Sequence, residues 1–274
     1  MHLLWPALLS LILISAPLIA AEPPPLGHLV VVGGGKTNPE IMQHALALGG
    51  GPAAHVVILP QASEVADTGE KSAAMWRELG AGTVTPLPDL HAAGTRPAIE
   101  AASVIWMPGG DQNVLAKALR EAGLADAILT RYRAGAVVGG TSAGAAITSQ
   151  LMITGEADLQ SITAGATQIA AGLGLWPEVI VDQHFVKRQR YGRLFSAVLD
   201  HPEKIGVGID EETAVVVSPD GWHVLGKSSV VIIDARSAQR PPAEPGTIAS
   251  ATGLRVHLLK AGMTWPLTGQ PERP

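Results

Sequence analysis

The sequence predicts an α/β fold built on a mainly parallel sheet. Short runs of Val, Ile and Leu alternate with segments of helical periodicity, and several runs end in glycine. Uninterrupted apolar runs are typical of strands buried on both faces, as in parallel sheets. Near the C-terminus such runs follow one another at short spacing, which predicts an antiparallel extension. Strands that alternate with helices imply right-handed crossovers between parallel neighbours.

The expected elements follow in chain order. HLVVVGG at 28–34 is the first strand, and Asn38-Pro39-Glu40 gives the next helix an N-cap, a proline at its first position and an early acid. The other expected strands of the first two thirds are 54–60, 102–110, 135–140 and 177–185. Helices are expected at about 69–79, 112–122 and 124–134, from 143 onward, and around 194–198. Five short strands, from IGVGID to RVHLLK, complete the fold.

Composition narrows the possible functions. The chain has 274 residues, of which 47% are hydrophobic, so it can bury a full core. Its net charge is −5, without the basic excess typical of nucleic-acid-binding proteins. It has no cysteine, which excludes disulfides, thiolate metal sites, cysteine nucleophiles and a lipid anchor on cysteine. Composition therefore gives no support for a nucleic-acid-binding protein and excludes sites that depend on cysteine.

The N-terminus predicts export. Residues 3–21 are uncharged and mostly apolar, and the polar, proline-rich EPPP follows Ala21. We therefore expect a signal peptide at 1–21 and a linker at 22–27, and a periplasmic or secreted protein with no membrane association after cleavage. An uncleaved anchor is the alternative, but Pro6 and Pro17 within the run favour a signal peptide. A single α/β domain is expected at 28–265, followed by a loose tail at 266–274.

Three expected strands end in residues that can carry chemistry. They are MPGGDQ, VGGTSAG and VDQHF. Ligands of open α/β sheets bind at the carboxyl ends of the strands. We therefore expect the three ends to converge on one site.

Ser142 is the candidate nucleophile. Gly140, Ser142 and Gly144 fit Gly-x-Ser-x-Gly at a strand–turn–helix junction, although small residues also form simple packing turns. A serine hydroxyl needs a base to attack a carbonyl, and the N–H of Ala143 can face a developing oxyanion.

His184 is the candidate base because it directly follows an apolar strand, beside Asp182 and Gln183. A carboxylate should orient its ring. Glu156 lies between Ser142 and His184 in the chain, Asp158 is close by, and Asp210, Glu211 and Glu212 form a second acidic group. Periodicity does not choose among these carboxylates.

Three arginines follow the histidine, at 188, 190 and 193. Cations at the start of a helix oppose its dipole, so arginines placed there usually meet an anion. The planar guanidinium fork matches a carboxylate, which predicts a substrate that carries carboxylate groups.

Taken together, these motifs resemble the cyanophycinase-like serine peptidases. The motifs are GGDQ at 109–112, GTSAGAA at 140–146, GLGL at 172–175, VIVDQHF with RxRxxR at 179–193, and GVGIDEETAVVV at 206–217. The resemblance implies a flavodoxin-like three-layer fold related to the class I glutamine amidotransferase domain. It also implies a triad of Ser142, His184 and Glu156, an oxyanion hole at Ala143 and Gly110, and no metal or cofactor. The residues that it implies for substrate binding are Gln112, Asp182, Gln183, Arg188, Arg190 and Arg193.

The resemblance implies an exported serine exopeptidase. Its substrate would be cyanophycin, a poly-aspartate chain with arginine on each β-carboxyl, cut through an acyl-enzyme to β-Asp-Arg dipeptides. The Asp182 carboxylate is expected to receive a substrate guanidinium, and dimers are common in the family. One alternative is an exported α-aspartyl or isoaspartyl dipeptidase. The other is a binding protein on this scaffold with a vestigial serine.

Overall fold

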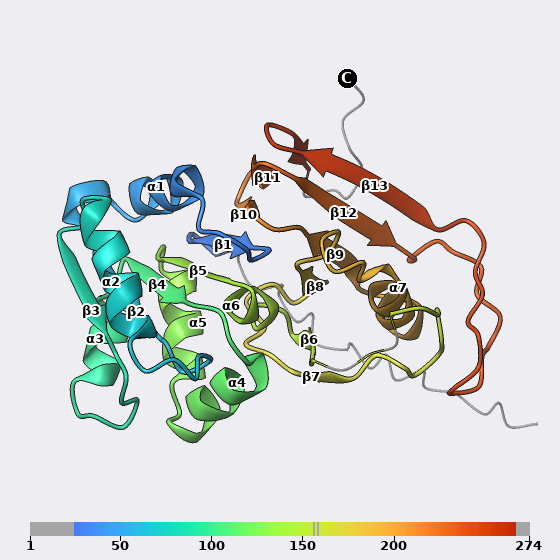
Figure 1. Cartoon of the computed structure of the whole chain (residues 1–274), viewed down its shortest axis with the longest axis horizontal. Coiled ribbons are helices and arrows are strands. Elements are labelled where there is room, and N and C mark those ends of the chain that lie inside the picture. The colour runs from blue at the N-terminus through green and yellow to red at the C-terminus, as the bar shows by residue number, and fades with distance from the viewer. Residues whose placement is uncertain (1–24, 156, 158, 267–274) are drawn as a thin grey trace, which may run out of the picture.

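The computed structural model describes residues 25–155, 157 and 159–266 (Figure 1). The predicted signal peptide, residues 22–24 of the predicted linker and residues 267–274 of the predicted tail lie outside these residues.

The main sheet has the order β14-β11-β10-β1-β5-β4-β2-β3. Its parallel part consists of β1 (His28–Val32), β5 (Val137–Thr141), β4 (Val104–Met107), β2 (His55–Ile58) and β3 (Thr83–Pro86). Antiparallel strands β10 (Thr213–Ser218), β11 (Gly221–Gly226) and β14 (Thr264–Trp265) extend it beyond β1. The predicted α/β class with a late antiparallel extension is confirmed.

A second sheet carries the remaining long strands, in the order β13-β12-β9-β8. They are β13 (Arg255–Lys260), β12 (Ser229–Asp234), β9 (Ile205–Ile209) and β8 (Val179–Gln183), and β8 pairs with β9 in parallel. A short hairpin of β6 (Leu151–Ile153) and β7 (Ile169–Ala171) forms a third sheet. The strand that precedes His184 therefore belongs to a different sheet from the strand that precedes Ser142.

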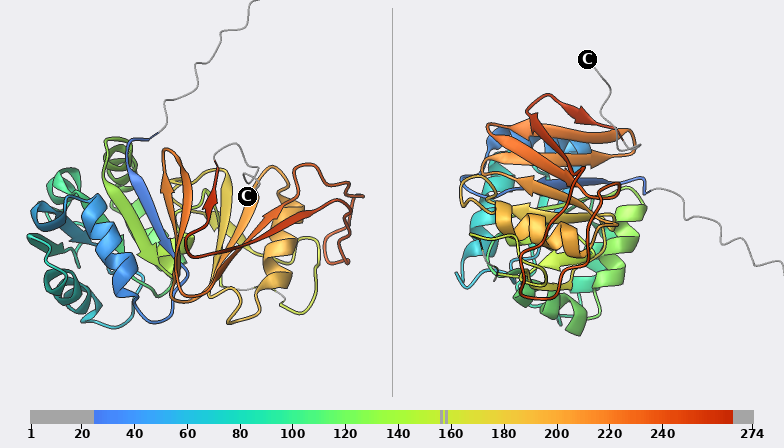
Figure 2. Two further views of the ribbon diagram at one scale, coloured as in Figure 1. Left: turned by 90° about the horizontal axis from the view of Figure 1, so that it is seen from above. Right: turned by 90° about the vertical axis from the view of Figure 1, so that its right-hand side faces the viewer.

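Helices cover both faces of the parallel strands (Figure 2). On one face lie α1 (Pro39–Leu48), a 3₁₀ turn at Gly51–Ala53, and α2 (Thr68–Glu78). On the other lie α3 (Thr95–Ala101), α4 (Gln112–Glu121), α5 (Ala125–Arg133) and the short α6 (Ala143–Ala146). The last helix, α7 (Tyr191–Asp200), packs on the second sheet. Within the described ranges, every helix falls short of the length and apolar character that a membrane span requires.

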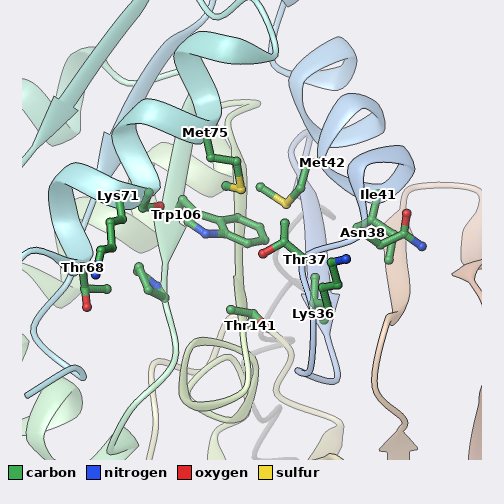
Figure 3. A pocket seen from close by; sticks show the side chains of 13 residues that line it. Lys36, Thr37, Asn38, Ile41, Met42, Thr68, Lys71, Met75, Trp106 and Thr141 are labelled. Carbon is green, nitrogen blue, oxygen red and sulfur yellow. The ribbon is translucent and has the colours of Figure 1, made fainter. Parts of the chain in front are cut away.

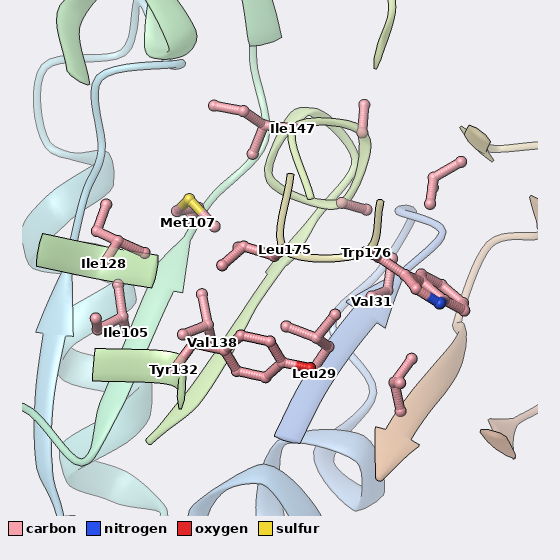
Figure 4. Close-up of a cluster of buried hydrophobic side chains, with 14 of the residues drawn as sticks. Leu29, Val31, Ile105, Met107, Ile128, Tyr132, Val138, Ile147, Leu175 and Trp176 are labelled. Carbon is pink, nitrogen blue, oxygen red and sulfur yellow. The ribbon is translucent and has the colours of Figure 1, made fainter. Parts of the chain in front are cut away.

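The main sheet has a hydrophobic core on each face, because successive side chains of a strand point to opposite faces. Leu29, Val31 and Val138 face α5, where they pack with Ile128 and Tyr132 (Figure 4). Val30 and Val32 point to the opposite face, toward the apolar side of α1. Fully burying each such side chain contributes roughly 1.5–3 kcal/mol, so the strand ends that carry the site rest on a rigid base.

Candidate active site

Ser142 lies on the sharp turn between β5 and α6. Its backbone has φ 55° and ψ −109°, which is unusual for a residue with a side chain, and its N–H donates to Val32 O at 3.0 Å. A Cβ on Gly144 would lie 1.9 Å from Met107 O, so only glycine allows the turn to approach β4 this closely. The predicted strand–turn–helix junction therefore exists, and it projects the serine beyond the carboxyl end of the sheet.

His184 reaches the serine from the end of β8. Its ring Nε2 lies 3.0 Å from Ser142 Oγ, and its backbone N–H donates to Gly33 O at 2.6 Å. The imidazole packs directly against Gly34, where an added Cβ would lie 2.4 Å from the ring. The glycines after β1 thus fix the position of a histidine that comes from the other sheet.

Glu211 is the carboxylate at the other ring nitrogen. Its Oε1 lies 2.7 Å from His184 Nδ1. The turn between β9 and β10 holds it there, because the N–H of the next residue, Glu212, donates to Gly34 O at 2.9 Å. Serine, imidazole and carboxylate are therefore connected by two hydrogen bonds, the arrangement that lets a neutral histidine take a proton from a hydroxyl.

This geometry favours a different acid from the one that the motif order favoured. Glu156 and Asp158 lie outside the described residues. Within the second acidic group, Asp210 accepts from the N–H of Lys187 and from the Ser228 hydroxyl, and Glu212 pairs with Lys227. Glu211, which chain order alone had not favoured, contacts the histidine because β9 runs parallel to β8 and ends beside it.

The environment keeps the histidine neutral. Burial lowers the pKa of His184, the hydrogen bond that its Nδ1–H donates to Glu211 opposes this effect, and the nearby Arg188 lowers the pKa further. An imidazole with a lowered pKa is unprotonated at neutral pH and is free to act as a base.

Backbone strain is concentrated around this triad. Among the described residues, the four non-glycine residues with positive φ are Ser142, His184, Gln189 and Glu212. Such conformations cost on the order of 1 kcal/mol or more each and cluster at functional sites.

The predicted oxyanion donors lie beside the serine. Ala143 follows Ser142 directly, and a Cβ on Gly109 would be 3.3 Å from that of Ser142. In the described part of the chain, the N–H groups of Ala143 and Gly110 make no hydrogen bond. Both are thus available to a ligand oxygen, and their role in an oxyanion hole stays a prediction.

The residues predicted to bind substrate are largely bonded to one another. Both guanidinium contacts of Arg193 go to the Asp182 carboxylate, and the two side chains are almost fully buried. Arg190 donates to the Gln183 backbone and side-chain oxygens at 2.8 and 2.6 Å. Asp182 therefore pairs with guanidinium groups of its own chain and not with the substrate guanidinium that was expected. The Asp182 carboxylate is also one of the anions that the arginines were expected to meet.

Two other predicted substrate-binding residues differ in exposure. Gln112 is buried and donates to Ile153 O at 3.0 Å. Arg188 is exposed, and within the described ranges it forms no ion pair. Burial together with the neighbouring Arg193 lowers the pKa of Arg190 to about 10, which leaves it charged at neutral pH. Arg188 is therefore open to a ligand, whereas Arg190, whose side chain is 12% exposed and lies 3.7 Å from Asp182 Oδ1, is open to one only in part.

Sequence reasoning left Glu211 as one of several candidate carboxylates and assigned no role to the loop after β1. The carbonyl oxygen of Gly33 accepts from the backbone N–H of His184, and that of Gly34 accepts from the backbone N–H of Glu212. The available signal was the triple glycine at 33–35, which directly follows a buried strand. No cluster of three or more His, Asp or Glu side chains that could hold a metal ion occurs among the residues that the structure describes.

Comparisons with known proteins agree with this architecture. The sequence matches peptidase family S51 over residues 29–225. It is 37% identical to a cyanophycinase of Trichormus variabilis over 248 residues, which cover 85% of this chain and 83% of that protein. It is 36% identical to a cyanophycinase of Geminocystis herdmanii, over 85% of this chain and 89% of that protein.

A solved structure is similar over most of the fold. The crystal structure of a peptidase from an acI-B1 Actinobacterium superposes with a TM-score of 0.66 at 25% identity, covering 88% of this chain and 97% of that one. The family match extends over the strands that carry the serine, the histidine and the glutamate. The chain therefore belongs to peptidase family S51 and is a serine-type peptidase.

Proposed function

We propose that this protein hydrolyses cyanophycin and releases β-Asp-Arg dipeptides. The observation that carries the proposal is the hydrogen-bonded series Ser142–His184–Glu211 at the junction of the two sheets. Its support on the substrate side is the identity of 36–37% to proteins named cyanophycinase. Arg188 and Arg190 beside the triad suit a substrate rich in carboxylates.

The triad supports acyl transfer. His184 Nε2 takes the Ser142 hydroxyl proton as Oγ attacks the scissile carbonyl, and the N–H groups of Ala143 and Gly110 receive the oxyanion. The tetrahedral intermediate collapses as the imidazolium passes its proton to the leaving amine, and an ester to Ser142 remains. Water, deprotonated by the same nitrogen, then attacks the ester and restores the serine hydroxyl. Glu211 stabilises the imidazolium in both halves of the reaction.

The arginines divide into two roles in this proposal. Arg188 and Arg190 bind carboxylates of the polymer, through the two-pronged pairing that a guanidinium favours. Arg193 and Asp182 hold β8 and α7 together beneath them, since their charges are buried against each other. Gln183 orients Arg190, and Gln112 ties α4 to β6 at the edge of the site.

Export is part of the proposal. A large polymer released by other cells must be cut outside the cell, and residues 1–21 have the composition of a signal peptide. N-terminal sequencing of the protein recovered from the periplasm or the medium should begin near residue 21 or 22. Recovery of an intact Met1 in the membrane fraction would instead support an anchor.

The direct test compares Ser142→Ala with the wild-type enzyme on purified cyanophycin. Loss of the nucleophile should lower kcat by several orders of magnitude, to the residual rate that binding alone supports, roughly 10³-fold over water. Ser250→Ala, an exposed serine far along the chain, is the matched control and should retain full activity. Covalent labelling by a fluorophosphonate should disappear only in Ser142→Ala.

The products separate the remaining alternatives. Release of β-Asp-Arg supports a polymer-cutting enzyme, whereas cleavage of short Asp-x peptides alone would identify a dipeptidase. Absence of labelling would favour a binding protein on this scaffold, since a vestigial serine is not activated.

A further inference from the structure

A pocket of about 240 Å³ lies beside the nucleophile, on the α1 and α2 face of the main sheet (Figure 3). Val32 and Thr141, at the ends of β1 and β5, form its edge nearest the triad. Pockets for drug-sized ligands usually measure about 300–1,000 Å³, so this one suits a single side group. The arginines of the candidate site belong to a different part of the chain, the segment from β8 to α7.

The lining of the pocket combines an apolar interior with a basic rim. Met42 and Met75 point toward Trp106 in its interior, and Lys36 and Lys71 stand at its rim (Figure 3). None of the 13 lining residues is acidic. Such a pocket favours a group that has an aliphatic stem and a negative charge.

The two lysines differ in what they already bind. Lys71 is paired with Asp67 at 2.9 Å, one helical turn away on α2. Lys36 is exposed and makes no ion pair within the described part of the chain. Its ammonium is thus available to a carboxylate that enters the pocket.

A buried hydroxyl provides a second polar contact. Ser72 Oγ lines the pocket, is shielded from solvent and has no hydrogen-bond partner among the residues that the structure describes. Buried polar atoms are nearly always satisfied in folded proteins, so an unpaired hydroxyl in a pocket indicates a ligand group that bonds to it. A hydroxyl oxygen can accept from an N–H donor at the far end of the stem.

The position of Lys36 indicates which part of a substrate enters. Lys36 is two residues after Gly34, which packs against the His184 imidazole. In acyl transfer that imidazole gives its proton to the leaving amine. The rim of the pocket at Lys36 therefore follows directly on the loop that packs against this imidazole, which favours the side group of the leaving residue as the part that enters.

We propose that this pocket binds the arginyl side group of the aspartate on the leaving side of the scissile bond, with Lys36 pairing to the α-carboxylate of that arginine. The aliphatic stem lies along Met42 and Met75, and the distal guanidinium donates to Ser72 Oγ. The inference rests on cyanophycin being the substrate. It assigns a specificity role to a loop outside the triad.

The test uses two synthetic substrates, each made of two β-linked Asp-Arg units. The second differs only in having agmatine, which is arginine without its carboxylate, on the leaving unit. Wild-type enzyme should prefer the first by about tenfold or more in kcat/KM, the value of a charge-assisted hydrogen bond. Lys36→Met should lose this preference by slowing hydrolysis of the arginine substrate alone. Lys117→Met, an exposed lysine on α4, should behave as wild type.

The outcomes separate the inference from the proposed function. Equal rates of the wild-type enzyme on the two substrates, or equal losses on both in Lys36→Met, would refute the pocket assignment and leave the proposed function intact. If wild-type enzyme cleaves neither substrate and does not degrade cyanophycin, the proposed function fails and the inference fails with it. Calorimetric binding of the arginine substrate to Ser142→Ala, with and without Lys36→Met, checks the contact independently of turnover.

Discussion

The carboxylate at His184 Nδ1 fixes the tautomer of the imidazole. With the proton held on Nδ1, Nε2 is free to act as the base. Glu211 makes this contact at 2.7 Å. Glu211→Gln replaces the acceptor with an amide and should lower kcat by about 10²–10⁴-fold, because the tautomer and the imidazolium lose their support. Glu156→Gln is the matched comparison and should change kcat by no more than about twofold. A large loss in Glu156→Gln with little loss in Glu211→Gln would restore the assignment that the motif order favoured.

Burial is the main cause of the lowered pKa of His184, and the charge of Arg188 adds to it. Arg188 lowers the pKa of His184, since a nearby cation disfavours the imidazolium. Catalysis requires the neutral ring, so activity falls as the pH drops through this pKa. Arg188→Gln removes the cation and raises the pKa, and the acid limb of the kcat/KM profile should therefore move to higher pH. Lys117→Gln serves as the control for an exposed cation elsewhere, and its acid limb should stay in place. A shift in the opposite direction, or none at low salt, would contradict this account.

At the scale of elements, β8 and α7 are joined by the buried pair of Asp182 and Arg193. Removing one partner of a buried ion pair leaves the other charge uncompensated and typically costs about 3–5 kcal/mol. Arg193→Met leaves Asp182 with Arg190, 3.7 Å away, as a remaining cation, so it should lower the free energy of unfolding by up to this amount, measured by urea denaturation. The exposed Arg188→Met should change it by less than about 0.5 kcal/mol. Adding Asp182→Leu to Arg193→Met should recover part of the loss. If Arg193→Met is fully stable but inactive, Arg193 contacts substrate after all.

The elements also show what the sequence could and could not predict. Val-rich runs and glycine stops identified β1, β2, β4 and β5 of the main sheet, because buried parallel strands leave a strong local signal, whereas the short edge strands β3 and β14 were not predicted. The division into two sheets was missed, since IGVGI and TAVVVS look alike in sequence although β9 and β10 pair in different sheets. Ser142 and His184 stood out because each follows a buried strand at a polar end. The contact of Glu211 with His184 depends on the pairing of β9 with β8. The spacing of residues along the chain does not reveal which strands pair.

At the scale of the whole molecule, the site lies where two sheets meet. The serine comes from the main sheet, the histidine follows β8 and the glutamate follows β9, both in the second sheet. β12 pairs with β9 along its whole length, from Ile205 to Ile209, and so supports the strand that leads to Glu211. Yet β12 and β13 lie beyond residue 225, where the match to the family ends.

The C-terminal strands should therefore be required for catalysis although they contribute no residue to the triad. A chain ending at Lys227 loses β12, β13 and β14 and exposes the edge of β9, whose unpaired backbone groups promote misfolding or association. We expect it to lose fluorophosphonate labelling of Ser142 and to be digested by trypsin far faster than the full chain. A chain ending at Pro266 keeps all the described strands and should label at the wild-type rate. Normal labelling of the shorter chain would show that β8 and β9 position His184 and Glu211 without β12. In that case the contacts of the main-sheet loop at Gly33 and Gly34 would suffice to hold the triad.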